Sequence, residues 1–372
     1  MNLLNLESIK VSRNNFLHSL HWFRGIAIIF VVMNHIPVPK VENFFVTFLH
    51  TIFANGTFFF VFVSGYLFWH LIDRYEYKKY LQDRLLFVIL PYVIITSLTM
   101  LFITLLEFYQ IDQIKFEGVI INFSQPFEAF SGVLWHFMVG RSILIPLWFI
   151  PFITLVFLFS FVFFKVAKTK YFFYIMLFFV AISLFTFRPV VEDTSYLFPV
   201  YMFGHFIGVF MFGIFLKQHQ DFVYQNSYLL MVILGLGYIT VIIYTFITHN
   251  LIIEFNKIVN IEQIKMFFGV VFFLSALFLI ENKIIDKGIH NQSLQKFLLT
   301  PLAILATYSF GIFFIHALVI KLVRRAHHVF WGEIASITSY IMLGVSTILI
   351  SLIIIVLIHK VLGHRSKYVV GC

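Results

Sequence analysis

The sequence predicts an all-α membrane protein, a polytopic bundle of about ten transmembrane helices with both termini in the cytoplasm. Three observations support this prediction. The chain of 372 residues is 61% hydrophobic and only 12% charged, and a soluble domain carries about twice that charge. Stretches of about 20 apolar residues, the length that spans a bilayer, recur along the chain. Lys and Arg gather mainly in alternate loops, as the positive-inside rule describes.

The apolar stretches place the expected helices in order. The first follows a basic segment (1–16) without a small-residue cleavage site, so we interpret it as a retained helix and not a signal peptide. Pro146 and Pro151 bracket LWFI and predict a broken helix start there. The segment 131–146 is either a re-entrant or an interfacial helix. The expected spans are 17–36, 44–71, 85–106, 147–164, 171–187, 197–216, 228–248, 264–281, 301–322 and 337–358.

The distribution of cations sets the expected orientation. With the N-terminus inside, three of the 26 Lys and Arg residues lie at membrane depth, seven lie outside and the other sixteen lie inside. The seven outer cations are Lys40, Lys115, Arg188, Lys257, Lys265, Arg324 and Arg325. This asymmetry predicts cytoplasmic termini, with 359–372 as a cytoplasmic tail. No internal repeat or linker marks a second domain, so residues 1–372 are expected to form one membrane domain.

Composition also limits the chemistry. The net charge of +9 is spread over the loops, which favours contact with anionic lipids and argues against nucleic-acid binding. The single cysteine, Cys372, is the last residue, so the chain offers no internal disulfide and no buried thiol nucleophile. No group of His and carboxylate residues has the spacing of metal ligands, so no metal is expected.

Arg24 and His35 stand eleven positions apart in the first apolar stretch. Eleven steps of about 100° bring both side chains to one helix face, separated by a rise of about 16 Å. An ionised Arg at that depth costs several kcal/mol unless it faces protein, water or a ligand. A guanidinium can hold phosphate and an imidazole can act as a general base near neutral pH. Alternatively, Arg24 reaches the cytoplasmic headgroups and His35 marks the outer interface.

Five segments together resemble the acyltransferase-3 family of bacterial membrane O-acyltransferases, in its polysaccharide-modifying form without an appended extracellular domain. They occur in family order: LHWFRGIAIIFVVMNH in the first span, FFFVFVSGYLFW in the second, Arg84 followed by Pro91-Tyr92, LWFIPF, and YSFGIFFIHALV in a late span. One departure is that Phe87-Val88 stands where the family often has paired arginines. Arg84 would then make that contact alone.

The resemblance implies a specific activity. A short acyl group, acetyl, would pass from acetyl-CoA to a sugar hydroxyl of a cell-surface polysaccharide or exopolysaccharide, or of its lipid-linked precursor, at the bacterial inner membrane. It implies His35 and Arg24 as catalytic residues, with His35 as general base or acyl carrier. Membrane lipids and polysaccharide synthase or export proteins are the further partners it implies. The implied donor-binding residues are Arg24, Arg84, Ser64 and Arg74, and the implied acceptor-binding residues are His316, Trp148, Tyr308 and Arg141.

Other interpretations stay open at this point. Gly65 and Trp148 suit helix packing, His316 suits a hydrogen-bonded structural residue, and Lys78 and Lys79 suit a positive-inside loop. Intramembrane Arg and His also serve transporters, so a flippase for a glycan intermediate or a transporter of a small solute is the alternative function. Transporters usually have matched discontinuous helices, and the sequence shows one break without a counterpart. A sensor or structural partner of a polysaccharide synthase is a third possibility.

Overall fold

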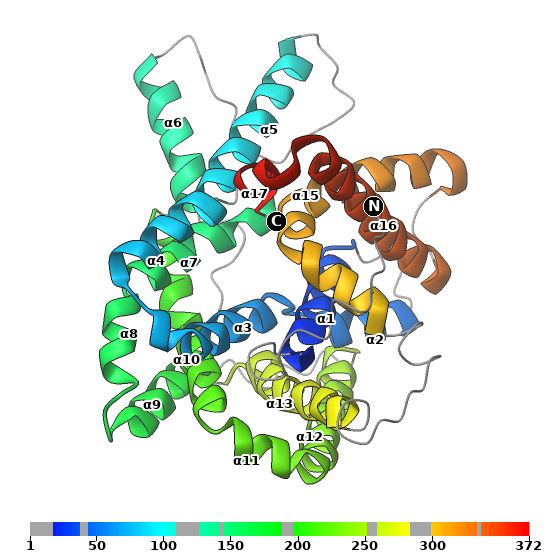
Figure 1. Ribbon diagram of the computed structural model, residues 1–372. Coiled ribbons are helices and arrows are strands. Elements are labelled where there is room, and N and C mark those ends of the chain that lie inside the picture. The colour runs from blue at the N-terminus through cyan, green and yellow to red at the C-terminus, as the bar shows by residue number, and fades with distance from the viewer. Residues whose placement is uncertain are drawn as a thin grey trace.

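A computed structural model describes residues 18–37, 44–108, 126–140, 144–187, 196–250, 259–282, 299–332 and 336–371. Every regular element within these ranges is a helix, in agreement with the all-α prediction (Figure 1). The expected outer residues Arg188, Lys40, Lys115 and Lys257 lie outside the described residues, as does Arg141.

Seven helical stretches among the described residues are long and apolar enough to cross a membrane, and an eighth qualifies if one bent pair is counted as a single span. The expected spans 17–36 and 171–187 form only α1 (His18–Asn34, 17 residues) and α9 (Phe172–Phe185, 14 residues). The expected count of ten is therefore not confirmed, and the side on which each terminus lies stays a prediction. The seven stretches are Phe44–His70, Tyr77–Leu101, Phe198–Gln218, Ser227–Thr248, Ile261–Glu281, Thr300–Phe330 and Ile337–Val370.

Two of the expected spans are discontinuous. The second consists of α2 (Phe44–Phe53) and α3 (Thr57–His70), joined by a turn in which Asn55 has a φ of 65°. Asn-Gly is a turn signal, and Asn tolerates this left-handed conformation. The fourth begins with the 3₁₀ turn Ile145–Trp148, as Pro146 predicts, and bends by 53° between α7 (Phe149–Leu158) and α8 (Ser160–Val166).

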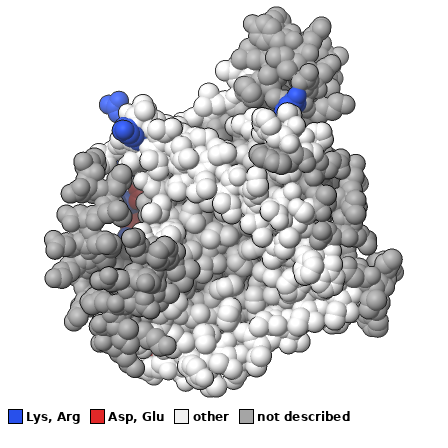
Figure 2. Space-filling view, turned by 90° about the vertical axis from the view of Figure 1, so that its right-hand side faces the viewer, with Lys and Arg blue, Asp and Glu red and all other residues white. Residues whose placement is uncertain are grey.

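Small residues allow the core helices to touch through their backbones. α3 packs along α10 (Phe198–Gln218), and a side chain added at Gly65 would clash with the carbonyl oxygen of Phe210. The packing interpretation of Gly65 is therefore confirmed. Phenylalanine rings fill the surrounding core, with Phe59, Phe62 and Phe206 among the largest fully buried side chains. Figure 2 shows a broad face that is almost free of charged side chains where residues are described, as contact with lipid requires.

The C-terminal segment is folded against the bundle. α16 (Ile337–Leu362) leads through the turn Gly363–Arg365 into α17 (Ser366–Val370), which lies beside α5 (Leu90–Phe108) (Figure 1). Ser366 and Val370 are buried. The segment expected as a tail from residue 359 thus continues α16 and then packs on the helices of the core. The other helices used below are α4 (Tyr77–Arg84), α6 (Pro126–Val139), α12 (Ser227–Asn250), α13 (Ile261–Glu281) and α15 (Thr300–Trp331).

Candidate active site

The candidate site is built on α1 and α15, which run in the same direction in direct contact. A side chain added at Gly25 would clash with the carbonyl oxygen of Leu302, so the two backbones touch there. The His21 imidazole meets the carbonyl oxygen of Ala303 at 3.1 Å near the start of both helices. This close pairing fixes which α15 residues face Arg24 and His35.

Arg24 contacts α15 through a buried serine. Its Nη2 donates to the Ser309 hydroxyl at 3.0 Å, and that hydroxyl donates onward to the carbonyl oxygen of Ala306 at 2.9 Å. Ser309 is completely buried, while Arg24 is half-buried. The guanidinium is therefore held inside the bundle by a hydrogen bond from a charged donor, which is stronger than one between neutral groups.

His35 contacts α15 through a second histidine. The rings of His35 and His316 meet edge to face with 5.2 Å between their centroids. Both Arg24 and His35 thus face α15, as their predicted shared helix face requires. Ser309 precedes His316 by seven residues, which is about 10 Å of helix rise. The guanidinium therefore lies about 10 Å from the level of the histidine pair, nearer than the 16 Å rise between the two α1 positions.

The hydrogen bonds of the two histidines fix which ring nitrogen is basic. His35 Nδ1 lies 2.7 Å from the carbonyl oxygen of Val31, and His316 Nδ1 lies 2.7 Å from that of Phe313. Because a carbonyl oxygen only accepts, each Nδ1 carries the hydrogen, and each neutral ring keeps its lone pair on Nε2. His316 Nε2 is buried without a hydrogen-bond partner among the described residues.

Three further elements hold the two ends of α1. The Tyr340 hydroxyl of α16 donates to the carbonyl oxygen of Met33 at 2.9 Å. Asn34 accepts from the backbone N–H of Asn55 at 3.2 Å, in the break between α2 and α3. At the opposite end of α1, both the backbone N–H and the hydroxyl of Ser19 donate to the carboxylate of Glu281. α1 is therefore fixed along its whole length, as a helix that positions reacting groups must be.

Arg84 lies at the end of α4, packed against aromatic rings. Its guanidinium carbon is 4.8 Å from the centre of the Tyr80 ring and 5.5 Å from that of Phe157. The Nε atom is buried without a hydrogen-bond partner among the described residues. An anionic ligand could take up this donor, because unsatisfied buried polar groups are costly. Arg74, in the 3₁₀ turn Ile72–Arg74, is exposed.

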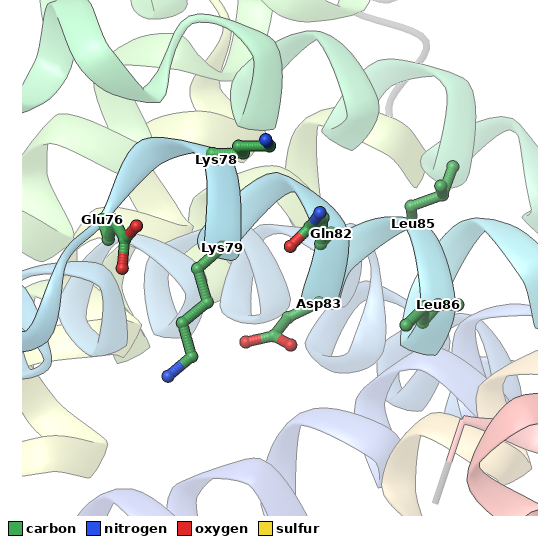
Figure 3. Close-up of a pocket in the computed structure, with 7 residues that line it drawn as sticks. All are labelled: Glu76, Lys78, Lys79, Gln82, Asp83, Leu85 and Leu86. Atoms are coloured by element: carbon green, nitrogen blue, oxygen red, sulfur yellow. The ribbon is translucent and has the colours of Figure 1, made fainter.

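A surface cavity of about 620 Å³ lies beside α4. In Figure 3, Lys79 and Asp83 extend to the same side of the helix, and Lys78 points in another direction. The cavity lining carries both signs of charge, so charge alone does not select its ligand. The lining residues are Glu76, Lys78, Lys79, Gln82, Asp83, Leu85 and Leu86.

The remaining predicted residues are not all brought to the histidine pair. Ser64 is half-buried and donates to the carbonyl oxygen of Phe60 on its own helix at 2.8 Å. Tyr308 is half-buried, with its ring 6.3 Å from that of His359 on α16. Trp148 is buried and stacks on Phe206 with 5.9 Å between ring centres, in agreement with packing.

The residue after Trp148 reaches the site more closely. Phe149 packs on Phe313, with 5.3 Å between the ring centres, and Phe313 packs on His316 at 5.9 Å. One aromatic ring, that of Phe313, therefore separates Phe149, at the start of α7, from His316 of the histidine pair. Arg141, the predicted acceptor contact just before it, lies outside the described residues.

Sequence reasoning placed one cation wrongly. Lys265 was expected among the outer loop cations, but it is fully buried in α13. Its Nζ forms a salt bridge of 2.6 Å with Glu262 and donates to the carbonyl oxygen of Thr51 at 2.6 Å. The spacing of Glu262 and Lys265, three residues apart at a helix start, was the available signal, because such residues share a helix face.

The fold and these buried polar contacts define a multi-pass membrane protein with a site inside its helix bundle. The chain matches the sequence model of an acyltransferase domain over residues 17–356. No curated protein and no solved structure matches it. Since the matched region covers nearly the whole chain, the protein belongs to the acyltransferase-3 family and is a membrane acyltransferase.

Proposed function

We propose that this protein is an O-acetyltransferase of the bacterial inner membrane. It would transfer the acetyl group of acetyl-CoA to a sugar hydroxyl of a cell-surface polysaccharide or exopolysaccharide, or of its lipid-linked precursor. The single observation that carries the proposal is the contact of His35 with His316, with the Nδ1 atom of each ring committed to a carbonyl oxygen. This arrangement keeps the lone pair of each neutral ring on Nε2, inside a bundle of acyltransferase type.

In the proposed reaction His35 Nε2 removes the proton of the acceptor hydroxyl. The oxygen attacks the thioester carbonyl carbon, a C–O bond forms and the C–S bond breaks. The sulfur of coenzyme A leaves with the electron pair of that bond and takes the proton from the imidazolium, which restores neutral His35. In the other route that the chemistry allows, Nε2 attacks the thioester carbonyl carbon first, the C–S bond breaks and coenzyme A leaves as the thiolate. The acceptor hydroxyl then takes the acetyl group from the imidazolium, and its proton passes to the thiolate.

The arginines are proposed to hold the donor. Arg84 has a buried Nε without a partner among the described residues. Its sequence neighbours Asp83 and Leu85 line the α4 cavity, although Arg84 itself does not. Arg24 contacts Ser309, which lies seven residues before His316 on α15. Its cation is therefore about 10 Å along the helix from the histidine pair. The phosphates of coenzyme A would meet Arg84, with exposed Arg74 nearby in sequence, and Arg24 would contact the donor deeper in the bundle. Ser64, Tyr308, Trp148 and Arg141 stay proposed ligand contacts without further support.

The test is release of coenzyme A and transfer of label from labelled acetyl-CoA to candidate glycans by the purified protein. General-base catalysis contributes about 10²–10⁴-fold, so His35→Ala should lower turnover by that factor. His21→Gln is the matched control, because it changes a histidine of the same helix and keeps an N–H donor for Ala303. Normal turnover by His35→Ala would disprove the assignment.

The same experiment separates the enzyme from a transporter. The structure adds an interruption within the span Phe44–His70, at the turn between α2 and α3, to the break expected at Pro146, and matched discontinuous helices are a feature of transporters. A transporter would move its solute without releasing coenzyme A. Release that depends on both the glycan and His35 supports the acyltransferase.

A further inference from the structure

The break between α2 and α3 removes hydrogen bonds that a continuous helix would make. The helical hydrogen bonds of α2 continue to Ala54, whose N–H donates to the carbonyl oxygen of His50 at 2.8 Å. In an unbroken helix the next N–H, that of Asn55, would donate to the carbonyl oxygen of Thr51. Instead the Asn55 N–H donates to the Asn34 side chain at 3.2 Å. The Thr51 carbonyl therefore needs a different donor, because unsatisfied backbone groups are costly at membrane depth.

That donor is Lys265. Its Nζ reaches the Thr51 carbonyl oxygen at 2.6 Å while it forms the salt bridge with Glu262. Lys265 is fully buried, and the Glu262 side chain is 35% exposed. A buried lysine is retained only where its charge is paired and its hydrogens are bonded. Here both requirements are met at the break. The Lys265 ammonium therefore satisfies the carbonyl group that the end of α2 leaves without a helical donor.

A second side chain satisfies the following carbonyl in the same way. The oxygen of Ile52, which in a continuous helix would accept from the Gly56 N–H, accepts from the Tyr238 hydroxyl of α12 at 3.4 Å. Side chains of α1, α12 and α13 therefore replace successive bonds of one helix. Because side chains from three other helices bond its free backbone groups, the break is a specific feature of the bundle and not the result of helix fraying.

The break contacts the part of α1 that orients His35. A side chain added at Gly56 would come within 2.6 Å of the carbonyl carbon of Phe30 and 2.7 Å of the nitrogen of Val31. Val31 supplies the carbonyl oxygen that holds His35 Nδ1. Asn34, which accepts from Asn55, directly precedes His35. The break thus contacts α1 at the Phe30–Val31 peptide, directly before the Val31 carbonyl, and at the side chain of Asn34, directly before His35.

We propose that Lys265 is a positioning residue for His35: by bonding the Thr51 carbonyl it fixes the α2–α3 break against the last turn of α1. This inference rests on the proposed function of His35. Lys265 acts through the backbone of the break and of α1. Loss of its bond would let the break move, and displacement of a reacting group by about 1 Å can lower turnover about 100-fold.

The test compares Lys265→Met with Gln263→Met. Both residues are fully buried in the first turns of α13, but Gln263 bonds to His205 of α10 and not to the break. We expect Lys265→Met to lower kcat about 10–100-fold with the KM for acetyl-CoA unchanged. Gln263→Met should keep kcat within about twofold at similar thermal stability. Lys265→Arg keeps a cationic donor in a larger side chain, so it should retain more of kcat than Lys265→Met.

Hydrogen exchange of peptides that cover residues 44–57 provides a readout that does not depend on activity. Lys265→Met should exchange faster there than the wild-type protein or Gln263→Met, and Tyr238→Phe should give a smaller change in the same direction. If Lys265→Met does not fold, the exchange rate and kcat of Tyr238→Phe are compared with those of Gln263→Met instead. Unchanged exchange at the break, or faster exchange with normal kcat, would overturn the inference. Normal turnover by His35→Ala would instead disprove the proposed function, and the coupling to His35 with it.

Discussion

His35 and His316 meet edge to face across the interface of α1 and α15, and each ring directs Nδ1 to a carbonyl oxygen of its own helix. These two hydrogen bonds fix the orientation and the tautomer of both rings. They prevent ring rotation and leave the lone pair of each neutral ring on Nε2. A histidine that was expected to be either structural or ligand-binding therefore lies next to the proposed base.

His316→Asn tests whether the second imidazole takes part in turnover. The amide of Asn can replace the Nδ1 donor toward Phe313, but it offers no basic nitrogen. We expect kcat to fall at least about tenfold, within the range of general acid–base effects, while the protein stays folded. His205→Asn, which alters another buried histidine bonded to Thr186 and Gln263, is the control. Steady-state release of coenzyme A is the measurement, and equal kcat values for the two variants would contradict a role for His316 in turnover.

Ser309→Ala tests the anchor of Arg24. The change removes the acceptor of a charged hydrogen bond, which contributes about 1.5–3 kcal/mol. The guanidinium would then lose its fixed position on α15. We expect the KM for acetyl-CoA to rise several-fold, with a smaller effect on kcat. Thr307→Ala is a suitable control, because its exposed hydroxyl bonds only within α15. Identical kinetics of both variants would show that Arg24 needs no anchor.

Some features of the site could be predicted from the sequence because they depend on one helix. The eleven-residue spacing of Arg24 and His35 places both on one face, and both contact α15. Pro146 predicts the 3₁₀ start of the fourth span because its ring cannot continue a helix from the preceding residues. Periodicity and local stereochemistry carry such information without knowledge of neighbouring elements.

Other features depend on partners that are distant in the chain. Ser309 is recognised as the partner of Arg24 only when α1 and α15 are placed together. The apolar stretch 44–71 conceals the α2–α3 break because hydropathy averages over Asn55-Gly56. The burial of Lys265 follows from a carbonyl that only this break exposes. Sequence periodicity cannot supply these contacts, because each is created by packing of several helices.

Gly25→Ala tests the close approach of α1 and α15. The new methyl group would clash with the Leu302 carbonyl oxygen, and such overpacking costs about 1–3 kcal/mol. The helices would separate, and the contacts of Arg24 and His35 with α15 would lengthen together. We expect a lower melting temperature and a loss of turnover. At Gly204 of α10 an added methyl group meets nothing within 4 Å, so Gly204→Ala should be neutral or slightly stabilising. A fully active, equally stable Gly25→Ala protein would contradict the backbone contact.

Deletion of residues 366–372 tests whether α17 is part of the bundle. α17 buries Val370 against the core, and the Tyr368 ring lies 5.5 Å from that of Phe87. Loss of this apolar contact should destabilise the protein by about 2–4 kcal/mol, because each large apolar side chain contributes about 1.5–3 kcal/mol when buried.

Two point variants show which part of α17 matters. Tyr368→Ala should lower the melting temperature in detergent by part of the effect of the deletion, since it removes one apolar contact. Lys367→Met keeps the apolar stem and loses only a cation placed 5.0 Å from the centre of the Phe87 ring, an interaction of about 0.5–1 kcal/mol at exposed sites. Its melting temperature should therefore stay close to that of the wild-type protein. A deletion variant with the same melting temperature as the wild-type protein would show that α17 contributes nothing to the stability of the bundle.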